Sequence, residues 1–117
     1  MNSVSGLVIF PDYYTHPSNV TDPASVNVEN AAFLSNIWSG TDWAAMEAAG
    51  CVFLPAAGLR EGTSVKNVGS EGRYWSSTPN LALANRAYRL YFSSSDVSPD
   101  NHIPRYYGYS VRLVQDL

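Results

Sequence analysis

The chain has 117 residues, which is the size of a single domain with one buried core. A composition of 45% hydrophobic and 15% charged residues indicates a globular chain and excludes a disordered one. No apolar run approaches the roughly 20 residues of a membrane span, so we expect no membrane insertion by this domain. The only cysteine, Cys51, excludes an internal disulfide and is expected to be a buried apolar side chain.

The net charge of −3 is unevenly distributed along the chain. Residues 1–72 contain seven acidic and two basic residues, whereas residues 73–112 contain five arginines, no lysine and two aspartates. Arginine mixed with tyrosine is typical of protein-recognition surfaces. A nucleic-acid site usually includes lysine in a basic domain, so we expect no nucleic acid as a partner.

The first three residues, Met1-Asn2-Ser3, show neither a basic stretch nor a long apolar region. No signal peptide is therefore predicted. A strand-like run begins already at Gly6, and we interpret the chain as one domain, 1–117, excised from a longer surface or phage protein.

Two helices are predicted in the first half of the chain. Residues 29–38 place apolar side chains on one face, with Gly40 as a C-terminal stop. Residues 42–49 form the clearer helix, with Thr41 as its cap and Gly50 at its end.

Strands are expected mainly in the second half. The candidates are runs rich in β-branched and aromatic residues, at 6–10, 51–54, 73–76, 86–93, near 97, and 107–114. Loops are expected at 15–28 and 56–71, where Gly, Pro, Ser and Thr are frequent. Helices followed by strands predict an α+β class, with two short helices on a small, twisted, mainly antiparallel sheet.

Alternation along 86–93 predicts which side chains are buried. Tyr88, Leu90 and Phe92 would face the core, and Arg89, Tyr91 and Ser93 would face solvent or a partner. The expected core consists of Trp43, Met46, Phe53, Leu54, Trp75, Leu90, Phe92 and Val111.

The sequence lacks the common motifs of catalysis and cofactor binding. There is no phosphate-binding glycine loop, no HExxH and no Gly-x-Ser-x-Gly turn. His16 and His102 have no neighbours at ligand spacing, and Asp96 with Asp100 does not fill the about six to eight oxygen positions around calcium. We expect no enzyme, no metal and no cofactor.

Several motifs, in order, resemble the bacterial "major paralogous domain" (FISUMP-like) family of secreted and surface proteins. They are Gly6–Asp12, Trp43 with Met46–Gly50, Phe53–Gly58, Gly69–Thr78 and Arg105–Arg112. The resemblance implies a C-type-lectin-like fold similar to that of formylglycine-generating enzymes and of the variable proteins of diversity-generating retroelements. It also implies an extracellular, cell-surface or phage-particle location.

The variable retroelement proteins bind other proteins through a diversified C-terminal stretch. Positions that match it here are expected to bind ligand: Arg89, Tyr91, Ser93, Asp96, Ser98, Asp100, Asn101, His102, Ile103, Pro104, Tyr107 and Tyr109. Tyrosine suits such a site because it offers rigid contact area at low entropy cost.

The sequence departs from the related families at two places, and these differences argue against calcium-dependent sugar binding and against the formylglycine-generating activity. Ser98-Pro99-Asp100-Asn101 lacks the acidic or amide residue that calcium-dependent sugar lectins place before proline. Cys51 has no partner, whereas formylglycine-generating enzymes need two active-site cysteines.

Three functions remain open. The first is a protein-binding display module, whose partner is a protein on another cell or host surface and which is a candidate retroelement variable protein. The second is a carbohydrate-binding or adhesin domain that stacks tyrosines on a glycan. The third is a structural surface module whose tyrosines only coat a sheet.

Overall fold

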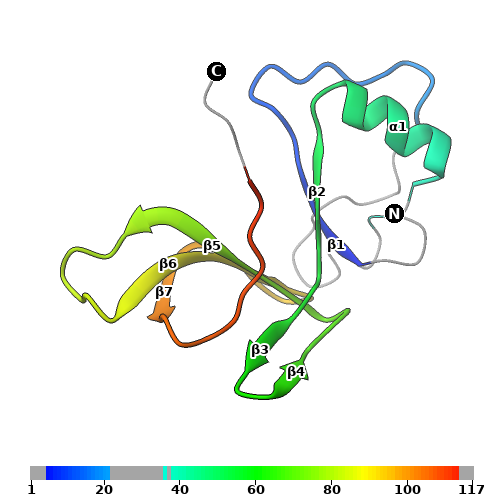
Figure 1. Cartoon of the computed structure of the whole chain (residues 1–117). Helices are drawn as coiled ribbons and strands as arrows, with labels where there is room; N and C mark the ends of the chain where they lie inside the picture. The colour runs from blue at the N-terminus through cyan, green and yellow to red at the C-terminus, as the bar shows by residue number, and fades with distance from the viewer. Residues whose placement is uncertain (1–4, 22–35, 37, 114–117) are drawn as a thin grey trace.

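The computed structural model describes residues 5–21, 36 and 38–113, which form one helix and seven strands (Figure 1). The elements are β1 (Gly6–Ile9), α1 (Gly40–Ala48), β2 (Val52–Pro55), β3 (Leu59–Glu61), β4 (Ser64–Lys66), β5 (Glu71–Pro79), β6 (Arg86–Ser93) and β7 (Val97–Pro104). The strands make three antiparallel sheets: a β1–β2 ribbon, a β3–β4 hairpin and a three-stranded β5–β6–β7 sheet.

The predicted α+β class, a C-type-lectin-like fold with two helices packed on a sheet, is wrong. The described part of the chain is mostly β-structure and contains a single short helix. The helix expected at 29–38 lies largely outside the described residues, and Asn36 and Trp38, which are described, are not helical. A single short apolar pattern is weak support for a helix, because helices of this length depend on tertiary packing.

Helix α1 confirms the prediction for residues 42–49, with a different cap. Ser39, rather than Thr41, precedes the first turn: its Oγ accepts a hydrogen bond from the Asp42 N–H at 3.0 Å and donates one to Asp42 Oδ2 at 2.8 Å. This exchange satisfies a backbone donor that the first turn leaves open. Gly50, at φ +94°, ends the helix in the left-handed conformation that glycine favours.

The β3–β4 hairpin overturns the expectation of an irregular loop at 56–71. Glu61 pairs with Ser64, so Gly62 and Thr63 alone make the turn. Gly62 has φ +60°, as a two-residue hairpin turn with glycine in the first position requires. In the sequence, Gly62-Thr63 was therefore the signal that could have predicted this hairpin.

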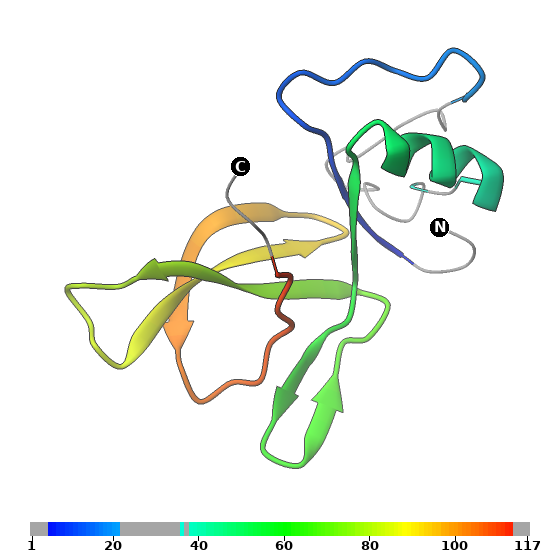
Figure 2. The ribbon, with the colours of Figure 1, turned by 45° about the horizontal axis from the view of Figure 1, so that its top comes forward.

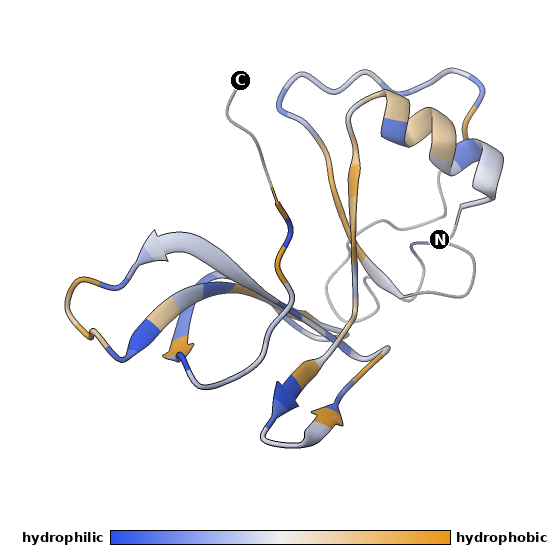
Figure 3. Cartoon of the chain, in the orientation of Figure 1, coloured by the Kyte–Doolittle hydropathy of each residue, from blue (hydrophilic) through white to orange (hydrophobic). Residues whose placement is uncertain are grey.

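The β1–β2 ribbon separates two hydrophobic clusters, because alternate residues point to opposite sides. On one side, Leu7 and Leu54 join Tyr74 and Phe92 of the large sheet. On the other side a second cluster packs against α1, and it contains Val8, Val20, Trp38, Trp43, Met46, Cys51 and Phe53. Figure 3 shows the ribbon as mainly hydrophobic, whereas the β5–β6–β7 sheet carries many hydrophilic residues.

Most of the predicted core is confirmed. Trp43, Met46, Phe53, Leu54 and Phe92 are buried. Trp75 and Leu90 are only partly buried. The prediction for Val111 is wrong, since this side chain is 65% exposed. Its predicted strand, 107–114, forms only isolated bridges at Gly108 and Ser110 within the described residues, and Val111 follows the second bridge.

Candidate functional site

The β5–β6–β7 sheet has one face on the core and one face turned away from it. The register pairs Glu71 with Ser93, Arg73 with Tyr91, and Trp75 with Arg89. These alternate with the core pairs Gly72–Phe92 and Tyr74–Leu90. Polar and aromatic side chains of two strands are thereby placed together on the outer face.

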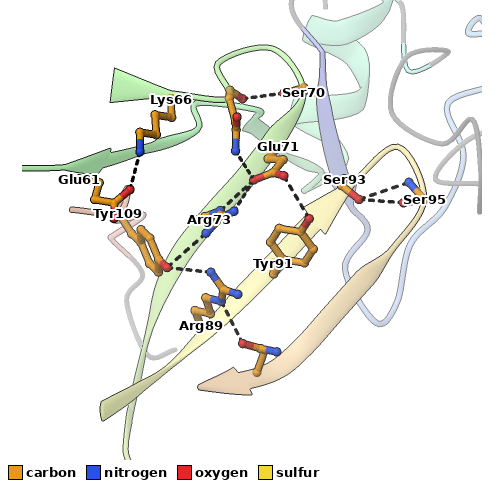
Figure 4. A network of polar contacts seen from close by, with 12 residues as sticks. Glu61, Lys66, Ser70, Glu71, Arg73, Arg89, Tyr91, Ser93, Ser95 and Tyr109 are labelled. Atoms are coloured by element: carbon orange, nitrogen blue, oxygen red, sulfur yellow. Dashed lines mark hydrogen bonds and ion pairs between the residues drawn. The ribbon is translucent and has the colours of Figure 1, made fainter. Parts of the chain in front are cut away.

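Five of these side chains form a network, called here the arginine–tyrosine cluster: Glu71, Arg73, Arg89, Tyr91 and Tyr109 (Figure 4). Arg73 Nε donates to Glu71 Oε2 at 3.0 Å and the two side chains form an ion pair. Tyr91 Oη donates to Glu71 Oε1 at 3.3 Å. Arg89 Nη1 donates to Tyr109 Oη at 2.7 Å, and Arg73 Nη1 donates to the same oxygen at 3.5 Å.

The two guanidinium groups also lie near the two tyrosine rings. The Arg89 guanidinium carbon is 5.0 Å from the Tyr91 centroid and 5.3 Å from that of Tyr109. The corresponding distances from Arg73 are 5.2 and 5.8 Å. All four lie within the about 6 Å range of cation–π attraction. Both cations therefore gain cation–π attraction from the two rings.

The cluster favours the ionised form of Glu71. Desolvation by burial raises the pKa of this carboxyl, but the hydrogen bonds from Arg73 and Asn67 and the Arg73 charge outweigh it, so the pKa lies below its ordinary value. For Arg73, desolvation lowers the pKa, while bonds to Glu71 and Tyr109 raise it above its usual range. The Glu71–Arg73 pair thus stays charged across the physiological range.

The C-terminal segment, residues 105–113, carries Tyr109 onto the sheet (Figure 2). Gly108 exchanges both backbone hydrogen bonds with Arg60 of β3, at 2.7 and 2.8 Å. Two residues later, Ser110 donates to Arg73 O and accepts from the Trp75 N–H, both at 3.1 Å. These contacts on either side fix the position of the intervening tyrosine.

A row of four aromatic rings begins at Trp75 on the sheet, passes through Tyr109 of the cluster and continues outward. We call it the tyrosine ladder: Trp75, Tyr109, Tyr107 and Tyr106. Successive ring centroids lie 4.4, 5.9 and 4.4 Å apart, and the Tyr107 and Tyr109 rings are stacked. The innermost ring is partly buried over β5, and the outermost, Tyr106, is 74% exposed. The ladder therefore runs from the sheet to the solvent.

The structure brings together five of the residues predicted to bind ligand: Arg89, Tyr91, Asn101, Tyr107 and Tyr109. Asn101 joins through its Oδ1, which accepts from Arg89 Nε at 3.1 Å. Arg89 and Ser93 lie on the face opposite the core side chains, as predicted, but both are buried and so are not open to solvent. The outer face of β6 is covered in part by Tyr109, which follows Arg89 by twenty residues and which strand alternation cannot detect.

Ser93 and Ser98 lie beside the cluster, opposite Glu71 and Tyr91 in the register, whereas the remaining predicted positions lie apart from it. The Asp96 carbonyl accepts from the Ser93 N–H in the β6–β7 turn. Asp100 lines a cavity of about 340 Å³ with Ser76, Thr78, Tyr88 and Pro99.

His102, Ile103 and Pro104 are partly buried in β7. The His102 ring meets Tyr88 edge-on at 5.7 Å, and Tyr88 alternates with Arg89. His102 therefore belongs to the opposite side of the sheet.

Sequence reasoning missed Glu71, Arg73, Trp75 and Tyr106. The i, i+2 spacing of Glu71 and Arg73 was a usable signal, since it places both side chains on one face of a strand. Trp75 continues the same alternation on the outer face but was predicted to lie in the core. Tyr106 was passed over in favour of its neighbour Tyr107.

Among the described residues, no three His, Cys, Asp or Glu side chains gather closely enough to hold a metal ion. No helix there is long and apolar enough to cross a membrane.

A family described as "Domain of unknown function (DUF8237)" matches residues 11–114, which include all of the cluster and the ladder. No curated protein and no solved structure matches the chain.

Proposed function

We propose that this chain, which belongs to the DUF8237 family, is a protein-binding module. Its contact surface is the outer part of the tyrosine ladder together with the accessible edge of the arginine–tyrosine cluster. The observation that carries the proposal is the ladder itself, whose outer rings lie against one another and end in Tyr106, which is 74% exposed.

The ladder has the properties of a binding surface that is ordered before the ligand arrives. Tyr107 is held between Tyr106 and Tyr109, and the Tyr106 hydroxyl lies 3.3 Å from that of Tyr107. Rings that are already fixed lose little conformational freedom on binding. Tyrosine and arginine are also the residues that most often supply the strongest contacts in protein interfaces.

The cluster supports the ladder from below. Tyr109 accepts hydrogen bonds from both arginines, and the segment around it is bonded to β3 and β5. A scaffold that served stability alone would have no need to extend the ladder to Tyr106, whose exposed ring gains little from burial. The proposal includes display outside the cell, on a bacterial surface or a phage particle, as the family resemblance implies.

A peptide-display selection against the immobilised chain tests the proposal. The matched variants are Tyr106→Ser with Tyr107→Ser, and Tyr13→Ser as control, because Tyr13 is 98% exposed and lies outside the ladder. We expect enriched peptides whose affinity falls at least tenfold with the ladder variant and is unchanged with Tyr13→Ser.

Two outcomes would contradict the proposal. Peptides that bind the ladder variant as well as the unaltered chain would place the interface elsewhere. Ladder-dependent binding to a glycan array, with no ladder-dependent peptide, would replace protein recognition by carbohydrate recognition.

A further inference from the structure

Arg89 is a buried cation with an incomplete set of partners. Its side chain is 7% exposed, and within the described residues it forms no ion pair. The only carboxylate of the cluster, Glu71, is bound by Arg73, Asn67 and Tyr91. Two guanidinium groups against one carboxylate leave the cluster with an excess positive charge.

Two of the three nitrogens of Arg89 are satisfied by neutral acceptors. Nε donates to Asn101 Oδ1 at 3.1 Å, and Nη1 donates to Tyr109 Oη at 2.7 Å. Nη2 donates no hydrogen bond to any described residue. Since no buried side-chain nitrogen or oxygen in this part of the chain lacks a partner, Nη2 must reach the solvent.

A carboxylate is the ligand group that best completes this arrangement. A buried charge is costly unless it is paired, and neutral acceptors and rings offset only part of that cost. A carboxylate would supply both the missing opposite charge and a short, charge-assisted hydrogen bond to the open Nη2. Asn101 and Tyr109 already hold the guanidinium plane, so little further ordering is needed.

We infer that the protein ligand presents an acidic side chain to Arg89 Nη2 while other parts of it contact the tyrosine ladder. This inference rests on the proposed function and specifies its partner: an acidic segment of a protein. Arg73 is not the residue that binds the ligand carboxylate, because its charge is already matched by Glu71.

The test uses NMR on the full chain with two small probes that differ only in charge, acetyl-glutamate amide and acetyl-glutamine amide. We expect the glutamate probe to shift the Arg89 Nε–H resonance saturably, and the glutamine probe to leave it in place. Arg89→Gln should weaken the glutamate probe at least tenfold, whereas Arg105→Gln, at an exposed arginine outside the cluster, should not.

A second variant keeps the inference open to refutation if Arg89→Gln does not fold. Glu71→Gln removes the only negative charge of the cluster and should tighten glutamate binding several-fold, more so at low salt. Because this substitution also leaves Arg73 without its ion pair, the larger shift should still be that of Arg89 Nε–H and not that of Arg73 Nε–H. Equal shifts by both probes, or glutamate affinity unchanged in Glu71→Gln and Arg89→Gln, would overturn the inference.

The two proposals fail separately. Ladder-dependent peptides that are neutral, with no response to the glutamate probe, would remove the acidic ligand and leave the protein-binding function. A response to glutamate at Arg89 without any ladder-dependent peptide would remove the protein-binding function and leave the carboxylate site.

Discussion

Gly72 lies on the core face of β5, directly beneath the ring of Phe92. A Cβ built on this residue would lie 1.9 Å from the Phe92 ring, and Phe92 is the largest fully buried side chain described. The glycine is therefore required by packing rather than by backbone conformation.

Gly72→Ala should destabilise the domain by about 1–3 kcal/mol, because its Cβ would overlap the fully buried Phe92 ring. Denaturant unfolding measures the change. Gly40→Ala is the matched control, since a Cβ there meets nothing within 4 Å. Equal stability of Gly72→Ala and the unaltered chain would mean that Phe92 is not packed as described.

Glu71 makes stability depend on pH in a defined direction. Its pKa in the folded protein is below the ordinary value of 4.5, so its contribution is present above that pH and is lost as the pH falls through the folded value. The free energy of unfolding should therefore drop more steeply in acid for the unaltered chain than for Glu71→Gln. Parallel curves for the two proteins would show that the Glu71–Arg73 pair adds no stability.

For single residues, alternation along a strand predicted the face on which a side chain lies better than it predicted how exposed that side chain is. Phe92 was correctly placed in the core, because alternation along a strand depends only on neighbouring residues. The burial of Arg89 was not predictable in the same way. It depends on Tyr109, which the fold brings over β6 from a separate segment.

The C-terminal segment, residues 105–113, makes backbone hydrogen bonds to two separate sheets. Between Gly108 and Ser110 it bonds to β3 and then to β5, so it connects the hairpin to the large sheet. Gly108 and Ser110 thereby hold Tyr109 at the centre of the cluster. The position of the candidate site therefore depends on a segment that is not itself a regular strand.

Gly108→Val should disrupt this connection, because a Cβ at this position would lie 2.9 Å from Arg60 Cβ. We expect faster amide exchange at Arg60 and Trp75, which donate to the Gly108 and Ser110 carbonyls, and unchanged exchange in α1. Unchanged protection of both amides would contradict the bridging role of the segment.

Elements with strong local signals were predicted well, and those that need distant partners were not. β6 has the predicted bounds, 86–93, and α1 lies close to its predicted range. The 107–114 segment has the composition of a strand but finds only single bridging partners among the described residues. The β3–β4 hairpin was missed because its strands are three residues long and almost wholly polar or exposed.

In the described part of the molecule, the β1–β2 ribbon packs against a different hydrophobic cluster on each of its two sides. Its one side packs with α1, and its other side supports the core face of the sheet that carries the cluster. Local patterns predicted both the ribbon strands and α1, yet the overall class was wrong. The fold class depends on the number of helices and strands and on how they pack together, and the hydrophobic pattern of a single element does not specify this.

The central claim is that the tyrosine ladder is a binding surface and not a support for the fold. Its most direct test compares melting temperature and affinity for a selected peptide in Tyr106→Ser, at a side chain that is 74% exposed, and in the unaltered chain. Exposed substitutions usually cost under about 0.5 kcal/mol, so the melting temperature should shift by only a few degrees while the affinity falls at least tenfold. Unfolding of the variant, or a large loss of stability with affinity retained, would show instead that the ladder is structural.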